Sequence, residues 1–397
     1  MLRSLSILVC AVGVGVPALV PGVANAMPAP EDAPFVTHHP KPKHHKAERP
    51  PAEVSEGSAD NPLAGGPWGV YTGDQDGVWP AYERAGGEEK ALLAKVALQP
   101  RVRWLHSGLG VGELGEKMRS EIAQEQDGNP DALVQFAWFR LWPHGEGARN
   151  RPLSGAEQAD YRAAVDAAVD AIGDARVAMI LEPDLALTAP PMRRGVTTTA
   201  DPGVRQSLVA YAAERFSSLP RTSVYLDAGD ADWLDQGKAL SVLEASGIKY
   251  ARGFALGATH YSSLAGNISY GAHLVSALEQ AGYGTKHFVV DTADNGRPFT
   301  WSEYYAKHPH GYFNNAETCG STAEELCDTL GPAPTWETDK DGLGLDAEQQ
   351  AEASEYADGY LWFGRPWLVN QAAPFSLERT LQVARTTPYD QTNVTGG

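Results

Sequence analysis

The stretch MILEPDLAL, residues 179–187, decides how the rest of the chain is interpreted. Its first three residues are apolar and indicate the end of a buried strand. Glu182 and Asp184 follow on either side of Pro183, a residue that restricts the backbone and donates no backbone hydrogen bond. Taken alone, the stretch is most simply a strand-to-loop boundary with two solvated acids, and only the pattern around it changes that interpretation.

Apolar runs typical of strands recur along the chain and alternate with amphipathic segments typical of helices. The expected strands lie within 101–108, 131–142, 175–184, 223–230, 286–296 and 358–366, and the expected helices within 154–173, 237–247 and 270–284. The first of these helices begins with the capping-box spacing of Ser154 and Glu157 and closes at Gly173. The alternation predicts an α/β fold with a mainly parallel sheet, either open or closed into a barrel.

Acidic residues follow three of the expected strands. Asp184, Asp227 and Asp291 each end a different apolar run. In a parallel barrel the carboxyl ends of the strands meet on one face, and that face carries the chemistry. Close carboxylates disfavour double ionisation, so one keeps a proton while another is charged. The three strand ends therefore predict a carboxylate cleft of the kind that hydrolysis of a glycosidic bond requires.

Composition limits the classes of partner. The 397 residues, 43% of them apolar, are enough for one large α/β domain or two ordinary ones. A net charge of −18 disfavours nucleic acid and anionic membranes as partners, whereas a neutral polysaccharide meets no electrostatic objection. Ten tryptophans and fifteen tyrosines supply flat rings for sugars, although most are expected in the core. No phosphate-binding loop or metal-ligand cluster is found, so we expect neither cofactor nor metal.

The first 60 residues are expected to lie outside the fold. Residues 1–26 have the basic start, apolar stretch and small-x-small ending (ANA, 24–26) of a signal peptide. Residues 27–60 are rich in proline, histidine and lysine and predict a disordered linker, with metal binding by the histidines as the alternative. No later apolar stretch is long enough to span a membrane. We therefore expect a secreted, extracellular protein, monomeric in solution.

Two cysteines follow the predicted signal peptide, Cys319 and Cys327. An even number in an exported chain predicts one disulfide that closes a short loop. Two free buried thiols are the alternative, and a zinc site is disfavoured because no other residue nearby has ligand spacing.

Several of these stretches, in the same order along residues 61–397, resemble motifs of glycoside hydrolase family 6, the cellobiohydrolases and endoglucanases that cut β-1,4-glucan. MILEPDLAL resembles the family's signature strand, and VYLDAGDADWL resembles YLDAGHAGWL. KYARGFALGATHY resembles A-GF-NVSNY, KHFVVDTADNG resembles FVIDTSRNG, and DGYLWFGRP resembles the start of DAYLWVKPPGESDG. Because the motifs are collinear, the resemblance is far more specific than any one of them.

The resemblance implies a distorted (β/α) barrel with fewer than eight strands and an inverting hydrolase that needs neither metal nor cofactor. Asp184 matches the proton donor, Asp227 matches a carboxylate that lines the sugar site, and Glu146 stands where the family has an aspartate that tunes the donor. Asp291 matches a buried acid with a mainly structural role. Trp104 and Trp233 match rings that contact the sugar, and His106 stands where the family's first strand often has an acid. With His260, these residues are the predicted substrate-binding positions.

The late segment departs from the family pattern. KPPGESDG reads GRPWLVNQ here, so Gly364 replaces a lysine, Leu368 a glutamate, and Asn370 the aspartate proposed as catalytic base. An amide does not take a proton from water at neutral pH, which leaves Glu146 and Asp227 as alternatives. Two functions stay open: an endo-acting β-1,4-glucanase, and a weakly active or non-catalytic glycan-binding homologue. Another β-1,4 polymer, such as an amino-sugar chain, is the alternative substrate.

Overall fold

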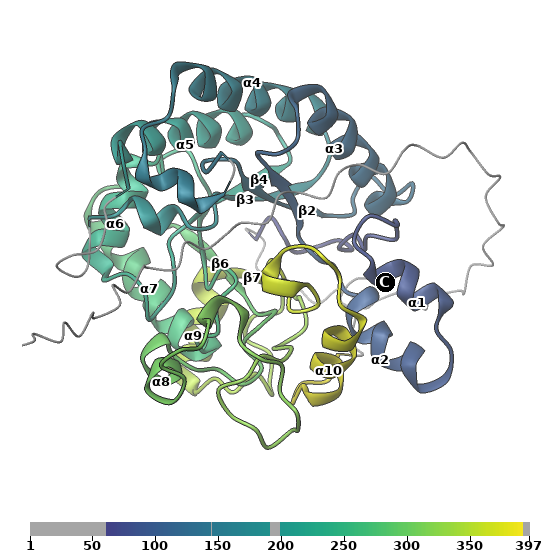
Figure 1. Cartoon of the computed structure of the whole chain (residues 1–397). Coiled ribbons are helices and arrows are strands. Elements are labelled where there is room, and N and C mark those ends of the chain that lie inside the picture. The colour runs from purple at the N-terminus through teal and green to yellow at the C-terminus, as the bar shows by residue number, and fades with distance from the viewer. Residues whose placement is uncertain (1–60, 144, 191–198, 392–397) are drawn as a thin grey trace, which may run out of the picture.

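The computed structural model describes residues 61–143, 145–190 and 199–391. The predicted signal peptide and linker lie outside these residues. Seven parallel strands form one sheet in which each strand pairs with the next along the chain, from β1 to β7. The sheet curls, and helices α3 to α7 lie around its outside (Figure 1). The predicted distorted barrel with fewer than eight strands is confirmed.

The strands are β1 (Arg103–His106), β2 (Val134–Phe139), β3 (Val177–Leu181), β4 (Thr222–Asp227), β5 (Gly253–Leu256), β6 (His287–Asp291) and β7 (Ala357–Leu361). The α-helices are α1 (Val78–Arg84), α2 (Gly87–Ala97), α3 (Val111–Gln126), α4 (Gly155–Ile172), α5 (Pro202–Ser217), α6 (Gln236–Ala245), α7 (Leu264–Gln280), α8 (Trp301–Lys307), α9 (Ala347–Tyr356) and α10 (Leu377–Thr386). Short 3-10 helices are η1 (Glu146–Asn150), η2 (Leu185–Thr188), η3 (Phe313–Asn315) and η4 (Val369–Gln371).

Strand β3 shows why the strands of this sheet have continuous apolar sequences. Met179 and its alternate neighbours face the helices, whereas Ala178 and Ile180 face the inside of the barrel. Both faces of the strand are buried, so every position favours an apolar side chain. The apolar run ends with β3 at Leu181, and the acids Glu182 and Asp184 follow directly after it.

The two edge strands, β1 and β7, approach each other at their ends. The Val102 amide donates a hydrogen bond to the Trp362 carbonyl at 2.9 Å, and Trp104 Nε1 donates one to the Phe363 carbonyl, also at 2.9 Å. These bonds place the start of β1 beside the exit of β7. Side chains from both strands consequently meet at the end of the barrel where the strands exit, which we call its mouth.

All six predicted strands and all three predicted helices are present. The capping box of α4 forms as expected, with the Ser154 side chain accepting from the Glu157 amide. Strand β5 was not predicted, because it has only four residues and begins with a glycine. Gly253 lies so close to β6 that a Cβ atom there would overlap the backbone of His287.

Asp291, the last residue of β6, binds the exits of three strands. Its Oδ2 accepts hydrogen bonds from the amides of Thr259 at 2.9 Å and Gly364 at 2.6 Å. Its Oδ1 accepts from the amides of Ala293 at 3.0 Å and Phe363 at 3.3 Å. Burial raises the pKa of this carboxyl to about 7, although the four amides favour the ionised form. Asp291 therefore fixes the loops that follow β5, β6 and β7.

The predicted disulfide is confirmed, since Cys319 and Cys327 are bonded and both are buried. Within the described ranges, no helix combines the length and the apolar character needed to cross a membrane.

Replacing Asp291 with alanine is expected to lower the free energy of unfolding by about 3 kcal/mol or more, because four buried amides lose their acceptor. Urea unfolding followed by circular dichroism measures the change. The matched control is Asp170→Ala on the exposed face of α4, which is expected to change stability by less than about 0.5 kcal/mol. A loss below about 1 kcal/mol for Asp291→Ala would contradict its role as the tie between strand exits.

Candidate active site

The turn after β3 holds its two acids in an unusual backbone conformation. Glu182 and Asp184 have φ angles of 56° and 74°, in the left-handed region that non-glycine residues seldom adopt. Each such residue costs of order 1 kcal/mol, so neighbouring bonds must hold the turn. The Glu182 amide donates to the Trp138 carbonyl at 2.7 Å, and the Leu185 amide donates to the Glu182 carbonyl at 2.8 Å.

The Glu182 side chain turns inward and holds the exit of β2. It has no exposed surface. Its Oε2 accepts from the amides of Arg140 at 3.1 Å and Leu141 at 2.9 Å, and its Oε1 accepts from the Tyr161 hydroxyl at 2.8 Å. Burial raises the pKa of Glu182 to about 8. Of the two acids in the opening stretch, Glu182 is therefore structural, and Asp184 is the one left half-buried at the barrel mouth.

Asp184 lies in the electrostatic field of Asp227, the last residue of β4. Asp227 has no exposed surface. Burial first, and then the charge of Asp184, raises the pKa of Asp227 well above its usual range, against the opposing effects of the Gly229 backbone amide and of the His260 charge. Double ionisation of this pair of carboxyls is consequently disfavoured.

The loops after β4 and β5 bring further predicted residues to the same place. His260 Nδ1 lies 2.6 Å from Oδ2 of Asp230, which is fully buried. The Trp233 ring lies 5.1 Å from the His260 ring, measured between centroids. The structure thus gathers Asp184, Asp227, Trp233 and His260 on the β3–β5 side of the mouth.

The other predicted residues lie on the β1 side. One face of the Trp104 ring carries the Arg365 guanidinium, whose carbon lies 4.0 Å from the ring centroid. His106 is exposed at the end of β1, and its Nδ1 accepts from the Gly108 amide at 3.1 Å. The pKa of His106 is lowered first by desolvation from neighbouring protein atoms, and then by the positive charges of Lys117, Arg140 and Arg365. The charges that act on His106 are thus positive, whereas those that act on His260 are negative.

The segment after β7 explains part of its own departure from the family pattern. A Cβ atom at Gly364 would overlap the Asp294 carboxylate, so a larger residue there requires that carboxylate to move. Oδ1 of Asp294 accepts from the Gln371 side chain at 2.7 Å. Asn370 is exposed, and its backbone amide donates a hydrogen bond to Asn315 Oδ1 at 2.8 Å. Position 370 therefore places no carboxylate at the site.

Glu146 begins η1, but its side chain lies outside the part of the chain that the structure describes, so its predicted role stays a prediction. Sequence reasoning missed Arg365 and Trp301. Trp301 is exposed. Its backbone amide donates a hydrogen bond at 2.7 Å to Oδ2 of Asp232, the residue directly before Trp233. An exposed ring next to the acidic side adds a surface on which a sugar can stack. Nothing in the sequence distinguished it from the core aromatics.

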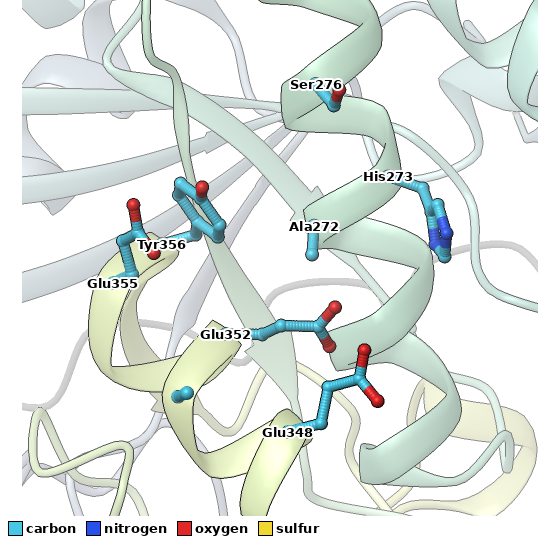
Figure 2. Close-up of a pocket in the computed structure, with 8 residues that line it drawn as sticks. Ala272, His273, Ser276, Glu348, Glu352, Glu355 and Tyr356 are labelled. Carbon is cyan, nitrogen blue, oxygen red and sulfur yellow. The ribbon is translucent and has the colours of Figure 1, made fainter.

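A separate hollow of about 320 Å³ lies between α7 and α9, in the outer helical layer (Figure 2). His273 and Ser276 line it from α7, and Glu348, Glu352 and Glu355 line it from α9. None of the predicted site residues takes part in it.

A half-buried acid paired with a buried one, beside aromatic rings at the carboxyl ends of parallel strands, is typical of enzymes that cleave glycosidic bonds. Residues 72–343 match the family model "Glycosyl hydrolases family 6". Because the match covers more than half of the chain, the chain belongs to glycosyl hydrolase family 6.

Curated relatives are endoglucanases. The chain is 27% identical over 292 residues to endoglucanase A of Cellulomonas fimi, covering 73% of this chain and 56% of that protein. It is 30% identical over 222 residues to endoglucanase 1 of Streptomyces halstedii, covering 55% of this chain and 65% of that protein. The chain thus spans less than two thirds of the length of either relative.

Solved structures share the fold. The endoglucanase Cel6 of Mycobacterium tuberculosis superposes with a TM-score of 0.62 at 24% identity, covering 82% of this chain and 99% of that one. Cellobiohydrolase II of Humicola insolens, solved with glucose and cellotetraose, gives a TM-score of 0.58 at 19% identity, covering 81% and 98%. At these identities the likeness establishes the fold alone.

The raised pKa of Glu182 predicts a pH dependence of stability. Between the ordinary carboxyl value of 4.5 and about 8, the folded state keeps a proton that the unfolded state releases, so wild-type stability falls as pH rises through this range. Glu182→Gln removes this contribution. We expect the stability of the variant relative to wild type to increase from pH 5 to pH 8.

Urea midpoints at pH 5, 6.5 and 8 measure this trend. Glu214→Gln, on the exposed surface of α5, is the matched control and should show no such trend. A stability difference between Glu182→Gln and wild type that does not change with pH would contradict the assignment of a proton to Glu182.

Proposed function

We propose that this chain is a secreted, inverting β-1,4-glucanase of the endoglucanase type, which hydrolyses β-1,4-linked glycan such as cellulose with Asp184 as general acid. The observation that carries the proposal is the Asp184–Asp227 pair at the exits of β3 and β4, in a chain that belongs to family 6. Secretion rests on the predicted signal peptide at residues 1–26, and endo action on the endoglucanase relatives.

The pair suits an acid-catalysed step. Double ionisation is disfavoured, so a proton is available at neutral pH. Asp227 has no exposed surface, whereas Asp184 is half-buried and within reach of a bound substrate. Asp184 then donates its proton to the glycosidic oxygen as the bond to the anomeric carbon breaks. Asp227 takes part indirectly, because its carboxyl keeps the proton within the pair.

The water-activating group is assigned differently from the family pattern. An inverting site needs a base roughly 6.5–9.5 Å from the acid, on the opposite face of the sugar. Asn370 has no carboxylate, and Asp227 is buried beside the donor, which is the wrong place for this role. We therefore assign the base to Glu146, which stands in the loop after β2.

A second function is favoured by two observations. Asn370 provides no base, and Arg365 already covers one face of the Trp104 ring. A weakly active or non-catalytic homologue would bind glycan with the remaining rings, Trp233 and Trp301, and release no sugar. Asp232, an exposed acid on the β3–β5 side, also suits a cationic amino-sugar polymer as an alternative substrate.

Asp184→Asn is expected to lower the release of reducing ends by about 100-fold or more, the loss typical of a missing general acid. Carboxymethylcellulose and mixed-linkage β-glucan are the substrates, and glycan binding should stay within a few-fold of wild type. Asp170→Asn on α4 is the matched control. Full activity in Asp184→Asn would refute the assignment of the donor, and a wild type that binds without turnover would support the glycan-binding function.

Arg365→Ala is expected to tighten the binding of cellotetraose about fivefold, because a sugar no longer has to displace a cation worth about 1 kcal/mol from the Trp104 ring. Isothermal titration calorimetry measures the change. Arg162→Ala is the matched control, since Arg162 also lies over an aromatic ring, that of Tyr211 on the outer helices, at 5.9 Å. Weaker binding in Arg365→Ala would mean that the guanidinium itself contacts the glycan.

A further inference from the structure

We propose that Asp230 and His260 form a positioning pair that holds an imidazolium cation against the Asp184 and Asp227 carboxyls and thereby sets the pH range over which Asp184 carries its proton. This inference deepens the proposed function and rests on it for the identity of the acid. The pair is a feature of this chain, because the motif that VYLDAGDADWL resembles has a histidine where Asp230 stands.

The geometry of the pair is that of an ion pair rather than of a neutral contact. Asp230 has no exposed surface, and its Oδ2 lies 2.6 Å from His260 Nδ1. Its Oδ1 accepts from the Asp232 amide at 2.9 Å. A fully buried carboxylate bound this closely to an imidazole favours the protonated ring.

The loops that carry the pair are held together by the backbone. The Gly257 amide donates to the Gly229 carbonyl at 2.9 Å, which joins the exits of β4 and β5. The Ala231 amide donates to Asn267 Oδ1 at 3.0 Å, which fixes the same loop to α7. Thr259, directly before His260, is held by Asp291. The imidazole is thus positioned from both sides.

The charges that face His260 come from two neighbouring loops. Asp184 approaches from the turn after β3, and Asp227, Asp230 and Asp232 approach from the end of β4 and its following loop. Burial alone lowers the pKa of His260, but these carboxylates outweigh it and raise the value to about 9. The aromatic rings of Trp233 and Phe313 cover the imidazole at 5.1 and 5.7 Å. His260 therefore stays charged across the neutral range.

The sign of the effect follows from the charges. An imidazolium favours the ionised forms of Asp184 and Asp227 and so lowers their pKa values. Since the general acid acts only when protonated, activity falls on the alkaline side as Asp184 loses its proton. Removing the cation raises the pKa of the acid and moves the alkaline limb of the kcat/KM profile to higher pH. Because His260 is charged at neutral pH, it is a positioning residue and not the base.

The primary test is an NMR titration of wild type, following the His260 imidazole and the ¹³C carboxyl signals of Asp184 and Asp227. The imidazole is expected to titrate above pH 8 in wild type and at a clearly lower pH in Asp230→Asn. In His260→Asn the carboxyl transitions are expected to move to higher pH by about one unit, the low end of the shift that a close charge causes. An imidazole that titrates at or below 6.5 in wild type overturns the proposal.

Two further variants distinguish the effect of the His260 charge from the effect of its shape. His260→Lys keeps a cation and is expected to hold the carboxyl transitions near their wild-type values, as a purely structural role would not. His260→Gln is a second neutral replacement with a longer side chain, so it tests the proposal where His260→Asn fails to fold. His273→Asn, on the exposed face of α7, is the matched control. Unchanged carboxyl transitions in both neutral variants overturn the proposal.

Activity provides an independent readout. If wild type hydrolyses β-glucan, the alkaline limb should shift upward by about one pH unit in His260→Asn and stay in place in His260→Lys and His273→Asn. If wild type releases no sugar, the proposed function fails, whereas the NMR titrations still decide whether the pair sets the protonation of Asp184 and Asp227. The two failures are therefore distinguishable.

Discussion

Two buried carboxylates that accept backbone amides hold the mouth of this barrel in place. Asp291 binds four amides from the exits of β5, β6 and β7, and Glu182 binds the exit of β2 from the turn after β3. Each amide would otherwise be buried without an acceptor, at a cost of about 1–3 kcal/mol. The strained turn around Asp184 and the left-handed Thr259 before His260 are stable only because these acids fix the backbone beside them. The position of the chemistry thus depends on acids that take no part in it.

The two sides of the barrel mouth carry different charged groups. On the β3–β5 side four aspartates surround one imidazole, and on the β1 side Arg365 lies over Trp104 near Arg140 and His106. The division follows from local packing after β7. Asp294 fills the space beside Gly364, which excludes a side chain at that position, and the next residue, Arg365, brings the positive charge across to the Trp104 ring.

Much of this fold was predictable because its strands are buried on both faces, which leaves continuous apolar runs in the sequence. Strand β5 was not, since a four-residue strand with a glycine imposed by its neighbour carries no such run. For the site, the acids at strand ends were predictable from the convergence of parallel strands. The local residue pattern does not separate Glu182, which turns inward, from Asp184, because both are acids flanking one proline. The family resemblance is what singled out Asp184. Contacts such as Asp230–His260 and Arg365–Trp104 depend on loop conformations between distant segments, and no local pattern encodes them.

The proposed proton donor and the position of the family's base depend on different loops. The proton donor and its partners lie on the exits of β3, β4 and β5, which are held by Glu182, Asp291 and the Gly257–Gly229 bond. The position of the family's base lies after β7, where Asn370 and Gln371 are held instead by Asn315 and Asp294. Because the bonds of Asn370 and Gln371 involve neither Glu182 nor Asp291, the segment around position 370 can change its sequence without disturbing the donor. This separation explains how the chain keeps the acid at position 184 although position 370 no longer has one.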